Sequence, residues 1–253
     1  MKAQGLRFWR QLGRDQIFWL VIGGLFIVYA LTSLRSVLPL LFTIGALVIA
    51  VTLHECAHAW SADRLGDPTA RLMGRVSLNP LVHLDPMGTV MMVITALTGY
   101  GIGWGKPTPV SPHRLRYGSR QGLALVSLAG PASNLVLAVV VGLLLRLIGR
   151  VQGGWYGYVL YFLQTLVFIN VVLSMFNLLP LPPLDGHAVL VGLFSLARGE
   201  WSWRVIQFLE SLERFGPMLL FGLILFSQFL GLNLIGRVIG PPTRVLVGLI
   251  LGA

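Results

Sequence analysis

The sequence is poor in charged residues, and this scarcity limits the class of protein that it can encode. Of its 253 residues, 11% are Asp, Glu, Lys or Arg, whereas soluble globular domains carry about 25%. So few charges cannot cover a surface that faces water. The composition therefore excludes an ordinary soluble enzyme, a disordered chain and a collagen-like fibre.

Cysteine and acidic residues are also scarce. Cys56 is the only cysteine, which excludes an intramolecular disulfide framework. The 9 Asp and Glu stand against 19 Lys and Arg, so the net charge is +10. The basic residues lie in short segments between apolar runs, as in the cytoplasmic loops of membrane proteins. No nucleic-acid-binding motif accompanies them, so we expect no nucleic-acid partner.

Long apolar runs are what the sequence has in abundance, with 55% hydrophobic residues and a mean hydropathy of +0.79. A helix needs about 20 apolar residues to cross a lipid bilayer. The runs predict an all-α polytopic integral membrane protein with about five or six transmembrane helices. The candidate spans are Ile17–Leu34, Val37 to about Ala62, Leu123–Leu145, Tyr158–Leu179 and Phe215–Leu234, with Leu232–Ile239 and Leu246–Ala253 as a further return or an interfacial piece.

Two further apolar segments, Met87–Thr98 and His187–Ala197, are too short to cross. The first leads into a stretch rich in Gly and Pro, which predicts a short re-entrant or extended segment, with β structure as one option, around residues 87–112. Lys and Arg cluster before the first run and after the second. This bias predicts a multi-pass protein of the cell membrane with a cytoplasmic N-terminus, whose second run ends on the cytoplasmic side.

The second run ends in His54-Glu55-Cys56-Ala57-His58, an H-E-x-x-H pattern on an expected helix. Residues four apart lie on one face of a helix, so both imidazoles can reach one metal ion. Glu55 lies next to His54, where it can take a proton from a water that the metal activates. Three ionisable groups at the end of an apolar span are costly unless they are used. This cost favours a metal site over a purely structural histidine pair.

A catalytic zinc needs a third protein ligand and an open fourth position. The candidates for that ligand are His83, Asp85, His113, Asp185 and His187. Asp185 is favoured because three prolines in residues 180–183 forbid regular helix just before it. Irregular backbone at membrane depth is tolerated only where it is buried in protein or lines a watery cavity. A carboxylate there can face the end of the second run, although an ordinary interfacial turn is the alternative.

Several separate segments resemble the site-2 proteases, zinc metalloproteases that cut within membranes. Besides the H-E-x-x-H motif, they are Asn79 to Gly88, Gly103 to Pro107 with Pro109 and Val110, Ala129 to Asn134, and Asn177 to Gly186. Their order and spacing are similar to those of the short bacterial and archaeal members, from about residue 40 to 215. The resemblance implies an enzyme that hydrolyses peptide bonds in or near transmembrane segments of membrane-anchored proteins, as in regulated intramembrane proteolysis.

The resemblance also implies roles for individual residues. By position, His54, His58 and Asp185 would bind one Zn²⁺ per chain, and Glu55 would be the catalytic base. Asn177 matches an asparagine associated with the substrate near the cleaved bond.

Two asparagines keep alternative interpretations. For Asn177, a hydrogen bond between helices is as good an explanation as contact with substrate. Asn134 follows a Gly-Pro kink. It is a weaker candidate for substrate binding or oxyanion support, and packing near the site is the interpretation that we favour.

We expect one membrane-embedded protease domain over residues 1–253, because the sequence has no room for the PDZ or CBS domains of longer members. Its catalytic core would cover about residues 37–190, and peripheral helices about 200–253. Two other functions would use the same ligands without hydrolysis: a membrane metal carrier or sensor, and a zinc-stabilised scaffold. A fourth protein ligand would favour the scaffold.

Overall fold

The computed structural model describes residues 23–24, 34–98, 103–148 and 156–252. The chain forms two compact units, residues 1–42 and 43–253. All packing described below lies within the second unit. The predicted first span, Ile17–Leu34, lies almost wholly outside the described residues.

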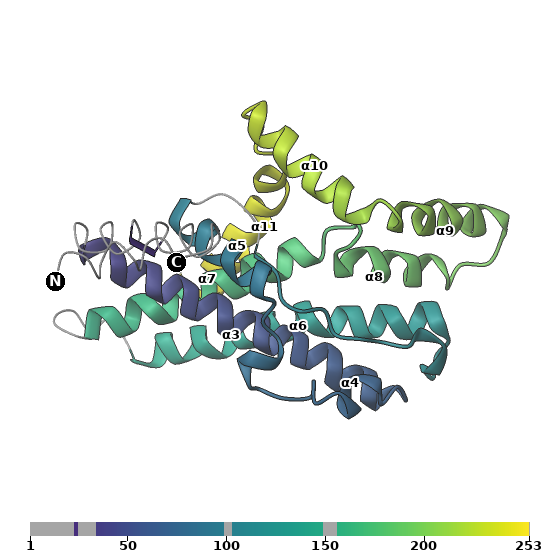
Figure 1. Cartoon of the computed structure of the whole chain (residues 1–253), viewed down its shortest axis with the longest axis horizontal. Coiled ribbons are helices and arrows are strands. Elements are labelled where there is room, and N and C mark those ends of the chain that lie inside the picture. Colours follow the sequence, from purple (N-terminus) through teal and green to yellow (C-terminus); the bar gives the residue numbers. More distant parts are fainter. Residues whose placement is uncertain (1–22, 25–33, 99–102, 149–155, 253) are drawn as a thin grey trace, which may run out of the picture. The chain divides into compact units, whose positions relative to one another are not determined.

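The described residues are mainly helical (Figure 1). The α-helices are α3 (Leu34–Arg64), α4 (Thr69–Leu72), α5 (Pro86–Thr98), α6 (Ser119–Ile148), α7 (Tyr156–Asn177), α8 (Asp185–Phe194), α9 (Glu200–Glu213), α10 (Gly216–Phe229) and α11 (Leu234–Leu251). Two short 3₁₀ turns, η1 (Pro80–Val82) and η2 (Pro112–Arg114), lie between them.

Four of the described helices are long and apolar enough to cross a membrane. They are α3 from Val37 onward, α6, α7 and α11. The prediction of an all-α polytopic membrane protein is therefore confirmed. Three of the four follow the predicted spans closely, because an uninterrupted apolar run marks each of them.

The prediction for the C-terminal region was partly wrong. Phe215–Leu234 was expected to span, but α10 covers only Gly216–Phe229, which is too short to cross. The helix α11 instead joins the two apolar pieces that flank Pro241 and Pro242 into one 18-residue helix. A break before Leu234, with residues in left-handed backbone conformations, separates the two helices.

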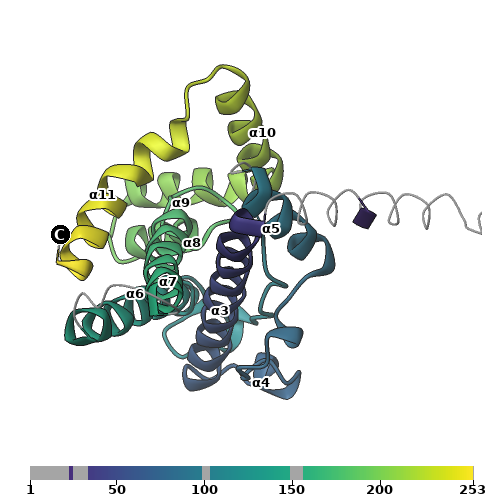
Figure 2. The same cartoon turned by 90° about the vertical axis from the view of Figure 1, so that its left-hand side faces the viewer.

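The core lies where α3, α6 and α7 meet. Its buried members are Ala46, Ala138, Val141, Leu166, Val167 and Val171. The two alanines, Ala46 and Ala138, are the kind of small side chain that lets membrane helices approach closely. The helix α6 also packs along α8, which packs against α9, while α11 packs against α6 and α7. In both views α10 and α11 lie on the opposite side of this core from α4 (Figures 1 and 2).

The segment around residues 87–112 combines a short helix and an extended return. The helix α5 is followed, after residues outside the described part, by extended backbone from Gly103 to Ser111. The helix α5 and the extended return pack closely against each other. A Cβ on Gly88 of α5 would clash with Trp104, and a Cβ on Gly103 would clash with Met92 of α5. The expected β option was wrong for the described residues, which form one isolated bridge, between Leu84 and Gly105, and no strand.

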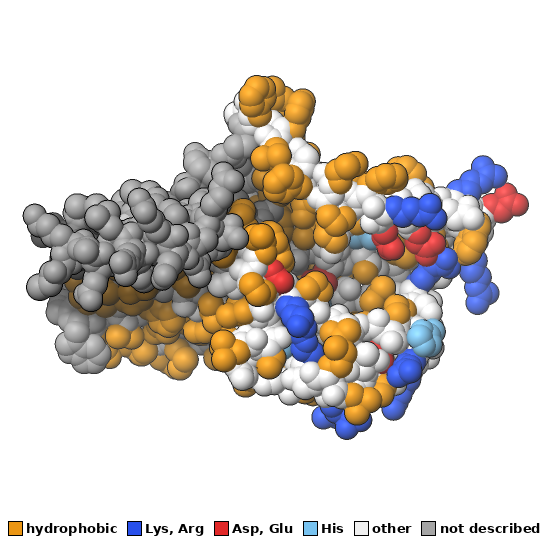
Figure 3. All heavy atoms as spheres, in the orientation of Figure 1, with side chains coloured by type: hydrophobic (Ala, Val, Ile, Leu, Met, Phe, Trp, Pro, Cys, Tyr) orange, Lys and Arg blue, Asp and Glu red, His pale blue; other side chains and the backbone are white. Residues whose placement is uncertain are grey.

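The charged side chains are unevenly distributed on the face seen in Figure 3. They gather around α4, α9 and the start of α6, while hydrophobic side chains cover much of the rest of the described face. This distribution fits helices whose sides contact lipid and whose ends reach water.

Candidate metal centre

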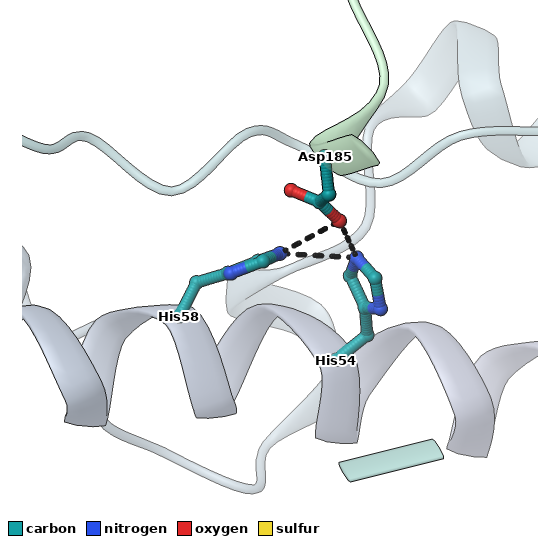
Figure 4. A group of neighbouring side chains, drawn as sticks. All are labelled: His54, His58 and Asp185. Atoms are coloured by element: carbon teal, nitrogen blue, oxygen red, sulfur yellow. Dashed lines mark hydrogen bonds and ion pairs between the residues drawn. The ribbon is translucent and has the colours of Figure 1, made fainter. Parts of the chain in front are cut away.

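Three side chains from two distant segments meet at the end of α3 (Figure 4). His54 and His58 extend from one face of that helix, and Asp185 is the first residue of α8. The Asp185 Oδ2 atom lies 3.1 Å from His54 Nε2 and 3.4 Å from His58 Nε2. The two Nε2 atoms are 3.0 Å apart. Both histidines are buried, and Asp185 is partly buried.

The position of Asp185 follows from the way α7 ends. That helix stops at Asn177, and the proline-rich turn of residues 178–184 brings the chain back to start α8. Gly186 packs against the preceding turn so tightly that a Cβ would lie 2.2 Å from the Leu178 carbonyl oxygen. Only glycine allows this approach, and it holds Asp185 against α3.

The backbone of α6 fixes the tautomer of His58. Its Nδ1 atom lies 2.8 Å from the carbonyl oxygen of Val126. A carbonyl oxygen can only accept, so Nδ1 carries the hydrogen and donates it. In the neutral imidazole, Nε2 therefore presents a lone pair toward Asp185.

An asparagine relay fixes the tautomer of His54 in the same way. Asn134 Nδ2 donates to the carbonyl of Ala50 at 3.0 Å and to Asn170 Oδ1 at 2.8 Å. Its Oδ1 must then face His54 Nδ1, at 2.8 Å, and accept from it. Asn170 Nδ2 in turn donates to Leu166 O. Both amide hydrogens of Asn134 are donated and its oxygen accepts from His54, so His54 Nε2 is left with a lone pair.

These three atoms fit a cation. Two imidazole lone pairs and one carboxylate oxygen face one another, and Asp185 Oδ2 has no hydrogen-bond partner among the described residues. Three acceptor atoms packed together without a positive charge are costly, and a divalent ion among them would neutralise the cluster.

The donor set is that of a zinc site with an open position. Two histidine nitrogens and one carboxylate oxygen are typical zinc ligands, and catalytic sites keep three protein ligands. In the described ranges no further His, Cys, Asp or Glu joins the cluster.

The other candidates for the third ligand lie elsewhere. His83 Nε2 is bonded to the Ser77 carbonyl at 2.7 Å, and His187 Nε2 lies 3.1 Å from a carbonyl of α9. Asp85 accepts from the backbone at the start of α5, and His113 is exposed.

Glu55 lies next to His54 on α3, and hydrogen bonds from Thr108 hold its carboxylate. Its Oε2 atom accepts from the Thr108 backbone N–H at 3.0 Å and from the Thr108 hydroxyl at 2.8 Å. Thr108 belongs to the extended segment that follows α5. The carboxylate thus lies between α3, which carries His54 and His58, and this segment.

Gly130 closes the space behind the two imidazoles. A Cβ at this position would lie 2.4 Å from His58 Nε2 and 2.7 Å from His54 Cε1. The next residue, Pro131, lacks an N–H and loosens α6 at this turn. The carbonyl of Pro131 accepts from Ser174 of α7, which ties the loosened turn to that helix.

The two asparagines named from the sequence occupy different places. Asn134 is fully buried behind His54, on the far side of the imidazole from Asp185. Asn177 is partly exposed, and its Nδ2 donates to a carbonyl of its own helix, Leu173 O, at 3.0 Å. Sequence reasoning missed Asn170. An Asn seven residues before Asn177 in the same apolar run was the available signal.

The chain matches a peptidase family and several relatives named as zinc metalloproteases. Residues 153–210 match the sequence profile of Peptidase family M50. The chain is 38% identical over 164 residues to YwhC of Bacillus subtilis, named as a zinc metalloprotease, and the match covers 61% of this chain and 69% of YwhC.

More distant relatives carry a similar name. Rip2 of Mycolicibacterium smegmatis, also named as a zinc metalloprotease, is 34% identical over 154 residues, which cover 59% of this chain and 56% of Rip2. Rip2 of Mycobacterium tuberculosis is 33% identical over 151 residues, or 58% of this chain and 55% of that protein. No solved structure matches the chain.

Proposed function

Because the chain belongs to the site-2 proteases, the membrane zinc metalloproteases of Peptidase family M50, we propose that it cuts its substrates within the membrane. It would hydrolyse peptide bonds in or near the transmembrane segments of membrane-anchored proteins, in regulated intramembrane proteolysis. The observation that carries this proposal is the cluster of His54, His58 and Asp185, whose three acceptor atoms face one another at the end of an apolar helix.

In this proposal His54, His58 and Asp185 bind one zinc ion through Nε2, Nε2 and a carboxylate oxygen. Zinc, when bound, supplies a Lewis acid that activates water and polarises the scissile carbonyl. Glu55 takes a proton from the attacking water and later gives it to the leaving amine. Its partly exposed carboxylate, next to the ligands on α3, supports this role.

The substrate must lose helical structure before its peptide bonds can be attacked, because a helix occupies its own carbonyls. We propose that the extended residues 103–111 receive the unwound substrate as an added strand. Among the described residues, the Asn177 side chain bonds only to Leu173, which leaves its amide oxygen and one hydrogen without a partner there. We propose that it hydrogen-bonds the substrate and supports the oxyanion. Asn134, which is buried, would act on His54 instead.

We propose that the whole chain is one protease domain in the cell membrane. The catalytic core would cover about residues 37–190, with peripheral helices from about 200. The N-terminus and the active site would lie on the cytoplasmic side, since Arg64, Arg71, Arg75 and Arg116 cluster near the end of α3.

The absence of a fourth protein ligand among the described residues favours hydrolysis over a scaffold. A structural zinc site is usually closed by four protein ligands. A metal carrier would need the three ligands but no base beside them. A carrier is therefore the second candidate, and Glu55 distinguishes the two.

The test compares zinc content and cleavage of a transmembrane substrate in detergent. Glu55→Gln should keep about one zinc and lose about 10²–10⁴-fold in cleavage rate, the usual contribution of a general base. Asp185→Ala should lose both zinc and cleavage. Glu200→Gln is the matched control, because Glu200 is exposed and pairs only with Arg204 on its own helix.

Three results would contradict the proposal. Wild-type protein without stoichiometric zinc under metal-replete conditions would remove its chemical basis. Unimpaired cleavage by Glu55→Gln would remove the base. Zinc binding without cleavage, together with Glu55-independent metal movement across vesicles, would favour the carrier.

A further inference from the structure

The structure points to a residue outside the metal ligands that controls where the proposed base lies. We propose that Thr108 is a positioning residue that aims the Glu55 carboxylate. This inference rests on the proposed function, and it adds a residue that the sequence motifs do not contain.

Thr108 contacts both the side-chain carboxylate and the backbone carbonyl of Glu55. Its backbone N–H and its hydroxyl lie 3.0 and 2.8 Å from Oε2, and the hydroxyl also lies 3.0 Å from the Glu55 carbonyl oxygen. A hydroxyl has one hydrogen, so it donates to one of these oxygens at a time. In either state the backbone N–H still holds Oε2. Two donors on one carboxylate oxygen fix the orientation of the group.

The other carboxylate oxygen is left available. Glu55 Oε1 makes no hydrogen bond with any residue that the structure describes. It faces Gly105, where a Cβ would lie 3.3 Å from it and 2.7 Å from Val51 Cγ1. A larger residue at 105 would crowd this oxygen. The arrangement divides the carboxylate into an anchored oxygen and an open one, as a general base needs.

The anchor itself is rigidly built. Thr108 stands between Pro107 and Pro109, whose rings restrict the backbone on either side. Two residues earlier, the Lys106 N–H donates to the His83 carbonyl at 2.7 Å. Three residues later, the Ser111 N–H donates to a buried carboxylate, Asp67, at 2.6 Å. The extended segment is thus fixed before and after Thr108, so the position of Thr108 defines that of Glu55.

This arrangement has a kinetic consequence. A free glutamate rotates about three side-chain bonds and spends little time in any one geometry. A displacement of about 1 Å in a catalytic group can cost about 10²-fold in rate. Loss of the Thr108 hydroxyl should therefore lower kcat and leave zinc binding unchanged, because Thr108 touches none of the three ligands. Substrate binding should also be unchanged, because an added strand binds through main-chain hydrogen bonds and the loss of the hydroxyl alters no main-chain group.

The experiment uses the full-length, zinc-loaded protein in detergent. Thr108→Val keeps the shape and the backbone N–H but removes the hydroxyl, whereas Thr108→Ser keeps the hydroxyl. We expect kcat to fall by about 10-fold or more in the Val variant, with KM and zinc content unchanged. The Ser variant should recover most of the wild-type kcat. Thr95→Val is the matched control, because the Thr95 hydroxyl donates to Met91 in its own helix and to no other residue that the structure describes.

A second measurement does not depend on proteolysis. The unfolding temperatures of Thr108→Val, Glu55→Ala and the double variant form a double-mutant cycle. If the hydroxyl acts on Glu55, Thr108→Val should lower the unfolding temperature of the otherwise wild-type protein. It should lower the unfolding temperature much less in a protein that already carries Glu55→Ala. Additive effects would overturn the inference.

The outcomes separate this inference from the proposed function. If the cycle shows coupling but the wild type does not cleave, the protease mechanism is contradicted. The Thr108–Glu55 contact would stand, but Thr108 would have no reaction to serve, so the inference would fail together with the proposed function. Wild-type cleavage with an equally active Val variant would overturn the inference alone. Loss of zinc in both Thr108 variants would show a structural role and also overturn it.

Discussion

At the scale of single residues, the geometry of the candidate centre is set by the hydrogen-bond acceptors behind its two histidines. The carbonyl of Val126 and the amide oxygen of Asn134 hold the Nδ1 atoms of the two histidines. Both acceptors come from α6, so this one helix sets both tautomers. Ligand orientation of this kind raises metal affinity, because the imidazoles need no reorganisation when the ion binds.

Asn134→Ala should therefore weaken zinc binding. The substitution removes the acceptor for His54 Nδ1 and leaves Asn170 Oδ1 and the Ala50 carbonyl without their donor. We expect the zinc dissociation constant to rise about 10–100-fold, as for other outer-shell partners. Asn177→Ala is the control and should leave zinc affinity unchanged, because the Asn177 side chain bonds to no described residue outside its own helix. Equal zinc affinity in both variants, measured by competition with a chelator, would contradict the relay.

Gly130→Ala should damage the centre without removing a ligand. The new methyl group would need the space now taken by the imidazoles of His54 and His58. We expect zinc affinity to fall by about 10-fold or more, an effect as large as loss of an outer hydrogen bond. Gly45→Ala on α3 is the control, since its methyl group would meet Phe162 at an ordinary 3.7 Å. The same competition assay would disprove this packing argument if the two alanine variants bound zinc equally well.

The sequence predicted those residues of the site that obey a local rule. His54 and His58 are four apart, so helical periodicity alone places them on one face. Asp185 could be singled out because prolines end the helix before it. Asn170 carried a signal that was missed, a second asparagine in the apolar run that ends at Asn177. Thr108 carried none, because Glu55 lies far away in sequence and no periodicity signals such a contact.

At the scale of elements, the extended segment after α5 depends on a buried carboxylate. Asp67 is fully buried and accepts hydrogen bonds from the backbone N–H groups of Ser111 and Thr69 and from the Thr69 hydroxyl. Burial alone would raise the pKa of Asp67, but these bonds lower it below its ordinary value. A group with a lowered folded-state pKa stabilises the fold when it is ionised.

Asp67→Asn should destabilise the protein in a pH-dependent way. At neutral pH we expect a loss of about 1–3 kcal/mol, the usual range for a hydrogen-bonded buried charge. The stabilisation is complete above the unfolded-state pKa of about 3.9. It disappears as pH falls through the lower folded-state pKa. The gap in unfolding temperature between wild type and variant should thus stay constant from about pH 7 to 5 and narrow below about pH 4.

The control for this experiment is Asp63→Asn. Asp63 pairs with Arg71 at the surface, where Arg71 is exposed and Asp63 is partly exposed. Such pairs contribute little, about 0–1 kcal/mol. The role of Asp67 would be disproved if Asp67→Asn lowered the unfolding temperature no more than Asp63→Asn does. It would also be disproved if the difference in unfolding temperature between wild type and Asp67→Asn widened in acid.

The boundaries of the elements show where hydropathy succeeds and where it fails. The spans α3, α6 and α7 were predictable because each is one apolar run between polar segments. The division between α10 and α11 was not, because apolar residues continue across it and backbone conformation decides the break. Left-handed backbone at Gly231 and Asn233 ends one helix and starts the next.

At the scale of the whole described fold, the ends of the helices sort into two sets. The end of α3, the start of α6 and the end of α7 lie together around the candidate centre. Arg146, near the other end of α6, donates to the carbonyls of Leu249 and Ile250 in the last turn of α11. A cation at those carbonyls is favourable, because the last carbonyls of a helix lack partners within it. The end of α11 is thereby fixed beside the end of α6.

This pairing predicts the side of the membrane on which α11 ends. The helix α6 has 30 residues, enough at about 1.5 Å each to cross the bilayer. If the candidate centre faces the cytoplasm, the ends of α6 and α11 lie on the outer side. In a Cys56→Ser background, a cysteine at Leu147 and one added after Ala253 should react with an impermeant maleimide in intact cells. A cysteine at Arg116, beside the start of α6, should react only after permeabilisation.

The control for folding is the zinc content of each cysteine variant, which should equal that of the Cys56→Ser parent protein. Labelling of both end positions only after permeabilisation, with Arg116→Cys labelled in intact cells, would invert the proposed orientation but keep the pairing of α6 with α11. Labelling of the added cysteine from the same side as Arg116→Cys would disprove the pairing. The Arg146 contact makes that result unexpected, because it would require α11 to end across the bilayer from the guanidinium that binds its last carbonyls.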